Sequence, residues 1–487
     1  MFTGSLPSSA ILAILPEILL LTLAVLILVV EFTLKPQDRR MLGWLTAGGL
    51  AVIIVISLAI ARPGDMPEAV WGGMLRHDWL GFTFGMLFLF GAAITTLFAM
   101  DVEHLGKRGE FYLLLLASTI GMNLMASSGD LVMLYLAIET TSIPLYVLAG
   151  FLTHDPKSTE SGFKYLFFGA LTSAILLYGF SLLYGFTGTT NLKDLALILV
   201  QGQIKPALTL GILLLILVGF GFKVSAVPFH FWAPDVYEGA PTPVAGFLST
   251  ASKAAGFAVL LRVLMTVFPD ATGTQGYWTS VIAVMSVATM TLGNTLALAQ
   301  KNIKRLLAYS SIAHAGYMLI GVAAISSLGV SSVVFYLVAY LITNLAAFGV
   351  VATFGRVVGS DEISAYAGLS RRAPGLSLVM LVAFLSLAGM PPLGGFVGKF
   401  FVFAAAVNSQ MVPLAVIGVL NSIIGLYYYL TVLKVIYLYR SNDEDKPIDI
   451  PRPSGIALVV LTFGILLVGT LFAPWFSWAT QAAAAMF

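Results

Sequence analysis

Long apolar segments recur along almost the whole chain, and they limit the possible folds more than any other feature. A helix needs about 20 apolar residues to cross the hydrocarbon of a bilayer. Fourteen segments, numbered as spans 1 to 14 in chain order, meet this need: 11–31, 41–60, 79–100, 111–128, 130–152, 163–187, 205–226, 243–267, 277–299, 303–323, 330–357, 376–406, 413–440 and 455–475. The pattern predicts an all-α integral membrane protein with about fourteen transmembrane helices.

The composition agrees with a chain whose main solvent is the lipid bilayer. Only 10% of the 487 residues are charged, whereas a soluble domain contains about 25%. The net charge of +2 is too small to favour nucleic-acid binding. Cysteine is absent, which excludes disulfides, thiolate zinc sites and cysteine-ligated iron–sulfur clusters. No Rossmann or P-loop motif is present, so we expect no cofactor and no metal in this chain.

Lysine and arginine are distributed unevenly between the two sets of loops. Loops after odd-numbered spans contain 15 of these residues, and loops after even-numbered spans contain 4. Because positively charged loops tend to stay in the cytoplasm, we expect both termini on the outer side of the membrane. No soluble domain or long linker interrupts the spans, so residues 1–487 are expected to form a single membrane domain.

Several charged side chains fall within spans. A charge at the centre of a membrane costs at least ~2.5–3.5 kcal/mol on insertion scales, so it often marks function. A long side chain near a span end can instead extend to the interface. We interpret Arg262 and Lys434 in this second way. Both interpretations remain open for Glu17, at the outer end of span 1, and for Lys164, at the start of span 6.

Glu139 lies several residues from either end of span 5, and its short side chain cannot reach an interface. Pro144 frees the backbone carbonyl of Thr140 from its helical hydrogen bond. The hydroxyls of Thr140, Thr141 and Ser142 could satisfy this carbonyl. We therefore interpret Glu139 as a functional residue.

Two spans are interrupted by prolines and glycines. In span 7, Lys223 precedes Pro228, and His230 follows it. In span 12, Lys399 follows the interrupted stretch MPPLGGFVG. Discontinuous helices with polar groups near the midplane are typical of transporter binding sites, so we predict a broken helix at both places.

Two further polar residues lie near the middle of spans. Lys253, in span 8, is surrounded by small residues that allow close helix contact. His314 lies in the middle of span 10. For His314, as for His230, the alternative to a functional role is a buried imidazole whose hydrogen bonds are simply satisfied.

The broken spans are five spans apart, which indicates an internal repeat. Spans 4–8 and 9–13 would each form a five-helix unit with a broken fourth member, and the odd span number would give the two units opposite orientations. The predicted subdivisions are 1–110, 111–267, 277–440 and 441–487, containing spans 1–3, repeat one, repeat two and span 14. The correspondence is imperfect, because Lys223 precedes its break and Lys399 follows its own.

These residue types suit proton transfer. Burial disfavours the charged form of a lysine, so a buried lysine can accept and release protons near neutral pH. The predicted proton relay consists of Glu139, Lys164, Lys223, His230, Lys253, His314 and Lys399.

Four stretches resemble subunit N of the proton-pumping NADH:quinone oxidoreductase, respiratory complex I: SGFKYLFFGALTSAILLYGFSLLYGFTGTTNL, FKVSAVPFHFWAPDVYEGAPTPVAGFLSTASKAAGF, KNIKRLLAYSSIAHAGYMLIG and LAGMPPLGGFVGKFFVF. The second stretch is shared by all antiporter-like subunits, whereas the first and the lysine of PPLGGFVGK look specific to subunit N. The resemblance implies two inverted five-helix bundles. It also implies a glutamate on span 5 paired with a lysine on span 7, a central lysine on span 8 and an exit residue on span 12. These positions correspond to Glu139, Lys223, Lys253 and Lys399.

The resemblance further implies a proton-translocating membrane-arm subunit in a bacterial inner membrane, with both termini in the periplasm. FMN, iron–sulfur clusters and quinone would bind to other subunits. The expected partners are other membrane-arm subunits, including antiporter-like ones. The alternative is a subunit of a multisubunit sodium/proton antiporter, which shares the helix arrangement; the Lys399 motif and the first stretch argue against it.

Overall fold

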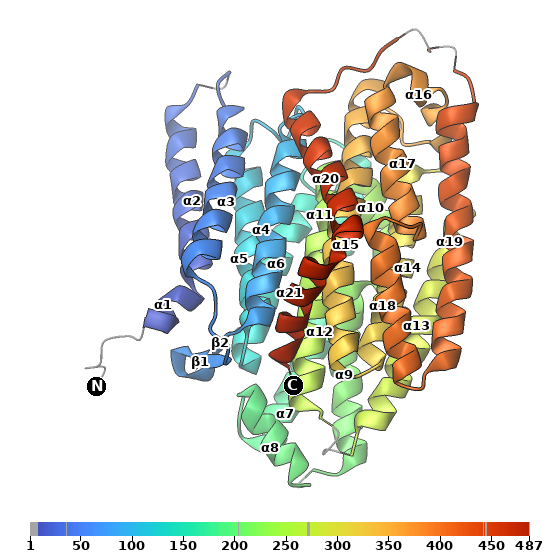
Figure 1. Ribbon diagram of the computed structural model, residues 1–487. Coiled ribbons are helices and arrows are strands. Elements are labelled where there is room, and N and C mark those ends of the chain that lie inside the picture. Colours follow the sequence, from blue (N-terminus) through green and yellow to red (C-terminus); the bar gives the residue numbers. More distant parts are fainter. Residues whose placement is uncertain are drawn as a thin grey trace.

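The computed structural model describes residues 8–486 except 36, 203, 270–272, 442, 444 and 445. Its helices stand side by side in one bundle, and the connections lie mostly at the two ends (Figure 1). Within the described residues, thirteen helices are long and apolar enough to cross a membrane. Predicted span 12 is divided between two shorter apolar helices, Pro374–Ala388 and Gly394–Asn408. The predicted all-α membrane fold is therefore confirmed.

The N-terminal part consists of three long helices with a small cap at one end. The helices and strands are α1 (Ser8–Ala13), α2 (Leu15–Thr33), α3 (Met41–Ile60), β1 (Glu68–Val70), β2 (Leu75–His77) and α4 (Trp79–Ala99). The strands form an antiparallel hairpin in which Ala69 pairs with Arg76. Trp71, in the turn between them, donates its indole N–H to the carbonyl oxygen of Ala10 at 2.9 Å, so α1 is held against the hairpin.

The middle of the chain contains predicted spans 4 to 8. Its helices are α5 (Gly109–Ser127), α6 (Leu131–Ala149), α7 (Pro156–Thr187), α8 (Leu192–Val200), α9 (Pro206–Val224), α10 (Trp232–Gly239), α11 (Thr242–Phe247) and α12 (Lys253–Val267). A tight turn between Ser127 and Leu131 joins α5 to α6. The turn contains Asp130, whose carboxylate accepts backbone hydrogen bonds from Val132 and Met133 and so caps α6.

The remaining helices contain predicted spans 9 to 14. They are α13 (Gln275–Ala297), α14 (Ile303–Ala323), α15 (Ser327–Val358), α16 (Leu369–Arg372), α17 (Pro374–Ala388), α18 (Gly394–Asn408), α19 (Val412–Leu438), α20 (Arg452–Thr470) and α21 (Phe472–Ala484). Helix α21 ends at the same end of the bundle as α1 and the hairpin (Figure 1). The inverted relation of the two repeats remains a prediction.

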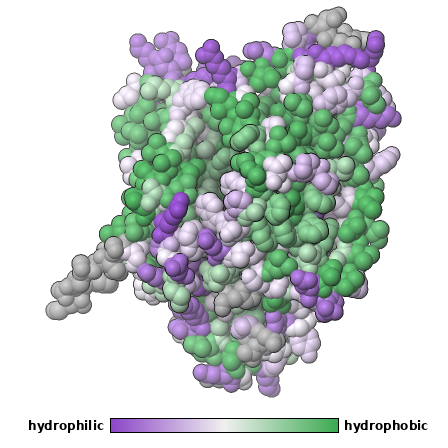
Figure 2. All heavy atoms as spheres, viewed as in Figure 1, coloured by the Kyte–Doolittle hydropathy of each residue, from purple (hydrophilic) through white to green (hydrophobic). Residues whose placement is uncertain are grey.

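Burial separates central helices from peripheral ones. All residues in the most apolar part of Thr242–Val267 are buried, and so are 94% of those in the most apolar part of Ile303–Ala323. In the most apolar part of α2 only 17% of the residues are buried. Hydrophobic side chains cover much of the side of the molecule, and hydrophilic ones gather towards the two ends (Figure 2). This distribution suits a bundle surrounded by lipid. Lys253 on α12 and the polar residues Ser311 and His314 on α14 are consequently buried inside the bundle.

Two local features differ from the predicted spans. Helix α7 begins at Pro156 rather than near residue 163, because Asp155 caps it by accepting a hydrogen bond from the backbone of Lys157. Lys164 therefore lies about two turns inside a helix. A π-helical turn, Leu248–Ser252, joins α11 to α12 directly before Lys253, and such turns are frequent at functional sites.

Candidate functional site

Lys223 on α9 lines a small cavity between α6, α7 and α9, and Glu139 on α6 lies beside it. Lys223 is 7% exposed, and its ammonium group donates to the hydroxyl of Ser142. The carboxylate of Glu139 accepts a hydrogen bond from Ser173 on α7. Both serines line a cavity with about 10 Å³ of space for water, which is enough for about one molecule. The structure thus brings the predicted pair to one site, each partner held by a different serine.

The three hydroxyls expected to satisfy the freed carbonyl of Thr140 bind the carbonyls of Leu136, Ala137 and Ile138 instead, so that prediction was wrong. Thr140 donates to the carbonyl of Leu136 at 2.8 Å, and Thr141 donates to that of Ala137 at 2.9 Å. Both hydroxyls therefore bond back to their own helix, as threonine commonly does within helices. Ser142 also accepts a hydrogen bond from Lys223. The partner of the Glu139 carboxylate comes from a neighbouring helix, which local spacing does not reveal.

The predicted break in span 7 is confirmed between α9 and α10. Ser225 adopts a left-handed conformation with φ of 59° and ends α9. Beyond the break, Trp232 donates its indole N–H to the carbonyl of Phe222 at 3.1 Å. His230 is only 4% exposed, and its Nδ1 has no hydrogen-bond partner among the described residues. His230, which has a free ring nitrogen, therefore lies on the other side of the helix break from Lys223.

Lys253 is the first residue of α12 after the π-helical turn. It is 1% exposed, and its ammonium donates to the carbonyl and hydroxyl oxygens of Ser311 at 2.9 and 2.5 Å. Helices α12 and α9 are in close contact, since a Cβ added to Gly256 would lie 3.1 Å from the Cβ of Lys223. The two lysines consequently occupy neighbouring, tightly packed helices.

His314 is held by two tyrosines in the centre of the bundle. Its Nδ1 is hydrogen-bonded to the hydroxyl of Tyr336 at 2.8 Å, and its Nε2 to that of Tyr429 at 3.2 Å. The hydroxyl of Tyr429 is also bonded to Ser310. The imidazole therefore has both nitrogens engaged, and either can serve as donor or acceptor according to its tautomer.

Lys399 lies at the predicted break in span 12, which is also confirmed. Helix α17 ends at Ala388, and the ammonium of Lys399 donates to the carbonyls of Leu387 and Ala388 at 2.9 and 3.1 Å. It also donates to Ser422 at 2.8 Å. A cation at a helix C-terminus is favoured by the helix dipole. The same ammonium lies 4.9 Å from the ring centroid of Tyr317.

Helix α14 connects the contacts of Lys253 with those of Lys399. The polar residues of α14 that form this connection are Ser310, Ser311, His314 and Tyr317. Their spacing of three and four places them on one helix face. Ser311 binds Lys253 at one end of this face, and Tyr317 lies against Lys399 at the other. The serines and tyrosines of this connection were missed by the sequence analysis, although the motif SSIAHAGY carries their helical spacing.

Lys164 is not part of this set. It forms ion pairs with Glu160 at 2.7 Å and Asp235 at 2.6 Å, and its side chain is 33% exposed. Arg305 pairs with the same Asp235 at 2.8 Å and with Glu238 at 2.9 Å. This charged cluster connects α7, α10 and α14 near one end of the bundle. The predicted membership of Lys164 in a buried relay is therefore not supported by its position.

The position of Arg262 also differs from its prediction. It was expected to extend to the interface, but it is 1% exposed. Its guanidinium makes two parallel hydrogen bonds of 2.8 Å to Asp78, and its Nε donates to the carbonyl of Ala126 at 2.8 Å. The bidentate ion pair compensates for burial, so no path to water is needed. Lys434, in contrast, is exposed as expected.

Comparisons with known proteins agree in the family they indicate. Residues 128–425 match the model of a protein family described as NADH:quinone oxidoreductase/Mrp antiporter, TM. The NADH-quinone oxidoreductase subunit N of Moorella thermoacetica is 43% identical to this chain over 473 residues, which cover 97% of this chain and 98% of that protein.

Solved structures give the same arrangement of helices. A chain of respiratory complex I from Thermus thermophilus with bound aureothin is 36% identical, with a TM-score of 0.79; the match covers 95% of this chain and 98% of that one. A chain of the Mrp complex from Dietzia sp. DQ12-45-1b has a TM-score of 0.87 over 99% of this chain and 98% of that chain. That second chain is only 21% identical, so it indicates a shared fold and nothing more.

Proposed function

This chain belongs to the NADH-quinone oxidoreductase subunit N family, and we propose that its buried ionisable side chains move protons across the membrane. It is a multi-pass membrane-arm subunit of complex I, which couples electron transfer from NADH to quinone with proton pumping, and it assembles in the bilayer with other membrane-arm subunits. The relay that we propose within it consists of Glu139, Lys223, Lys253, His314 and Lys399. His230 is a candidate entry group at the break in span 7.

The observation that supports this relay best is the polar face of α14. Lys253 is bound to Ser311 at one position of that face. One turn further on, His314 is hydrogen-bonded to two tyrosines. Another turn further, Tyr317 lies against Lys399. Groups that can both donate and accept a proton thus form a series through a dry interior, where ionic groups without function would only destabilise the protein.

Glu139 and Lys223 are proposed to control loading of this relay. Each is held by a serine that lines the same water-sized cavity. A water in that cavity would connect the ammonium group of Lys223 with Ser173, which is bonded to the carboxylate of Glu139, and would allow a proton to pass between the two groups. The pair would therefore act as one unit, whose two members depend on each other.

A double-mutant cycle tests the pair. Glu139→Gln removes the negative charge that faces the ammonium group, and Lys223→Ala removes the ammonium group itself. Both variants should lower NADH-driven quinone reduction and proton uptake, and the double variant should be no worse than the poorer single one, because residues of one network are not additive. All rates are normalised to the amount of assembled complex.

Glu139→Asp is the matched control for this cycle, since it keeps the charge and should retain part of the activity. Wild-type rates in Glu139→Gln, or losses that multiply in the double variant, would contradict the proposed pair.

The second candidate function is that of a sodium/proton antiporter subunit. It is favoured by the matching family model, whose description also names the Mrp antiporter, whereas the sequence relatives are subunits of NADH-quinone oxidoreductase. Purification of the tagged chain in mild detergent distinguishes the two. Co-purifying flavin and iron–sulfur subunits would support complex I, while small hydrophobic partners alone would favour the antiporter.

Two finer points belong to the same proposal. FMN, iron–sulfur clusters and quinone bind to other subunits of the complex, and this chain holds no redox centre of its own. The orientation follows from the loop charges, with both termini on the periplasmic side of a bacterial inner membrane. Reporter fusions at the C-terminus should therefore report the periplasm, and fusions near Arg371 the cytoplasm. The opposite result at both points would refute the orientation.

A further inference from the structure

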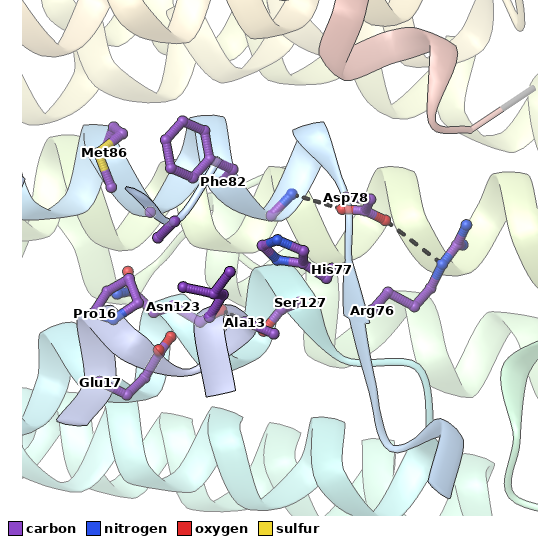
Figure 3. Close-up of a pocket in the computed structure, with 14 residues that line it drawn as sticks. Ala13, Pro16, Glu17, Arg76, His77, Asp78, Phe82, Met86, Asn123 and Ser127 are labelled. Atoms are coloured by element: carbon purple, nitrogen blue, oxygen red, sulfur yellow. Dashed lines mark hydrogen bonds and ion pairs between the residues drawn. The ribbon is translucent and has the colours of Figure 1, made fainter. Parts of the chain in front are cut away.

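A second polar pocket lies apart from the relay, where α1 and the hairpin cover one end of the N-terminal helices (Figure 3). It is lined by Glu17 of α2, His77 of β2, Asn123 and Ser127 of α5, and Phe82 of α4. We call it the cap pocket. It offers about 30 Å³ of space for water, and about 10–15 Å³ is needed for each water molecule. The cap pocket can therefore hold about two waters.

Three side-chain atoms in the cap pocket are buried without a hydrogen-bond partner among the described residues. They are Oε2 of Glu17 and both Oδ1 and Nδ2 of Asn123. Asn123 is only 4% exposed, and both residues line the same small space (Figure 3). Buried polar atoms are rarely left unpaired in proteins, and an exception calls for a ligand, a water or a proton.

The nearest basic groups are directed elsewhere. Arg76 lies 3.5 Å from Asp78, and its guanidinium donates to the carbonyl of Ala485 at 3.4 Å. Its side chain runs away from Glu17 in Figure 3. Arg262 uses its guanidinium on Asp78 and Ala126. Neither arginine is therefore available to neutralise an ionised Glu17.

The other titratable groups around the cap pocket do not neutralise Glu17 either. Helix α3 contains no charged residue, and the one in α5, Glu110, lies in its first turn at the opposite end. Arg62 and Glu68 are exposed at the outer rim. Burial lowers the pKa of His77, although Glu68, Asp78 and a hydrogen bond to the Arg62 backbone act in the opposite direction. The lowered pKa disfavours the charged form of His77, which is half-buried and lines the pocket.

We propose that Glu17 is a proton-binding site, which holds its proton with Asn123 and water as partners and exchanges it past His77 with the aqueous phase beside the hairpin. Glu17 as a residue is half-buried, but its Oε2 is buried, and a carboxylate that buries an oxygen without a counter-charge is disfavoured in its ionised form. The N-terminal position in α2 favours negative charge, but that effect is weaker than the cost of burying an unpaired ion. A protonated carboxyl can donate to Oδ1 of Asn123 and accept from its Nδ2, which satisfies all three unpaired atoms.

The site is independent of the relay proposed above. The proton is taken from water at the hairpin end and is returned to that water, so no other co-reactant is required. Loss of the relay would leave the Glu17 site unchanged, and the test below measures its protonation directly rather than through pumping.

The test is modification by a hydrophobic carbodiimide, which reacts with protonated carboxyls in apolar surroundings. Membrane vesicles containing the whole complex are treated, and labelled peptides are identified by mass spectrometry. Glu31, on the same helix, is the matched control, since it accepts a hydrogen bond from the backbone of Gly109 at 2.9 Å and lies 3.9 Å from Arg39. Glu17 should take up several-fold more label than Glu31, and Glu17→Gln should remove that label alone.

Vesicles of both orientations show on which side of the membrane the pH controls the protonation of Glu17. The chain contains no cysteine, so Glu68→Cys and an impermeant thiol reagent reveal on which face the hairpin lies. Labelling of Glu17 should fall as the pH on the hairpin face rises, and should ignore the pH on the other face. This arrangement separates the proposal from the orientation inferred from loop charges.

Three outcomes would overturn the proposal. Labelling of Glu17 no greater than that of Glu31 would show an ionised or inaccessible carboxylate. Dependence on the pH of the opposite face would place its exchange path elsewhere. Protection of Glu17 by sodium ions at constant pH would indicate a site for a metal cation instead of a proton.

Discussion

In span 7 the lysine precedes the break, in the last turn of α9, whereas in span 12 Lys399 follows the break, in the second turn of α18. The carbonyls at the end of the first half-helix are satisfied differently in the two places. In span 7 a neutral donor, the indole of Trp232, binds the carbonyl of Phe222. In span 12 the ammonium of Lys399 itself binds the carbonyls of Leu387 and Ala388.

This difference leaves the two ammonium groups with different freedom. An ammonium group has three donors. Lys399 uses three contacts, two to carbonyls and one to Ser422. Among the described residues, Lys223 has a hydrogen bond to Ser142 only. Lys399 is therefore fixed at a helix end, while Lys223 can exchange a partner for water or for the nearby carboxylate of Glu139.

A break in a span is therefore not by itself evidence of one particular function. Both breaks combine a lysine with prolines or glycines. In span 12 the ammonium of Lys399 has three hydrogen-bond partners, whereas in span 7 the ammonium of Lys223 can still bind groups of a neighbouring helix. Sequence position alone made the two breaks look mismatched. The contacts give this mismatch a physical meaning, and the following substitutions test it.

The largest effect is expected for Lys399→Ala. The substitution leaves the carbonyls of Leu387 and Ala388 without their donor, and each buried unpaired group costs about 1–3 kcal/mol. NADH-driven proton uptake by vesicles should fall by at least about tenfold, the factor that corresponds to ~1.4 kcal/mol. Lys434→Ala is the control, because Lys434 is exposed on α19. Equal losses of proton uptake in the two variants, at equal assembly, would contradict a specific role of Lys399 in proton transfer.

An intermediate effect is expected when the serine partner of each lysine is removed. Ser142→Ala takes away the single described partner of Lys223, whereas Ser422→Ala leaves Lys399 with two carbonyls. A hydrogen bond to a charged group contributes ~1.5–3 kcal/mol, so Ser142→Ala should slow proton uptake about tenfold and Ser422→Ala much less. If Ser422→Ala is the more damaging of the two, the proposed difference in freedom is wrong.

The smallest effect is expected at the glycine that ends α17. Gly389 has φ of 87°, and an added Cβ would lie 3.0 Å from Cδ of Lys399. Gly389→Ala should cost roughly 1–2 kcal/mol in backbone strain and displace the lysine, reducing proton uptake a few-fold. Gly359→Ala is the matched control, since Gly359 has φ of 71° but open space around it.

Thermal unfolding of the purified complex separates strain from function in this pair of variants. Both alanines should lower stability by a similar amount, because both positions require a left-handed backbone. Only Gly389→Ala should slow proton uptake per assembled complex. A similar loss of uptake in Gly359→Ala would mean that strain, and not the position of Lys399, causes the effect.

The fold was predictable to a large extent because its signals are local. Apolar length marks the spans, and the prolines and glycines near Lys223 and Lys399 mark the two breaks. Both kinds of signal were confirmed, since the bilayer leaves the backbone few alternatives to a helix. The start of α7 was misplaced because an Asp155–Pro156 cap extends that helix beyond its apolar part.

The candidate site was predictable only in part. Glu139, Lys223, Lys253 and Lys399 were recognised because a charge in an apolar span is conspicuous. Their partners were not recognised, since serine and tyrosine occur in many spans without any role. The proton-transfer roles of these residues remain predictions, which the variants above address.

The sequence by itself determined that this chain is a membrane protein, where most of its apolar helices lie and where two of them break. Those features follow from the hydrophobic length and backbone chemistry of single segments. Only the tertiary structure decided which polar groups meet. Lys253 binds a residue 58 positions away, and Arg262 pairs with one 184 positions away. Such contacts depend on how helices pack against each other, and that packing belongs to no single segment.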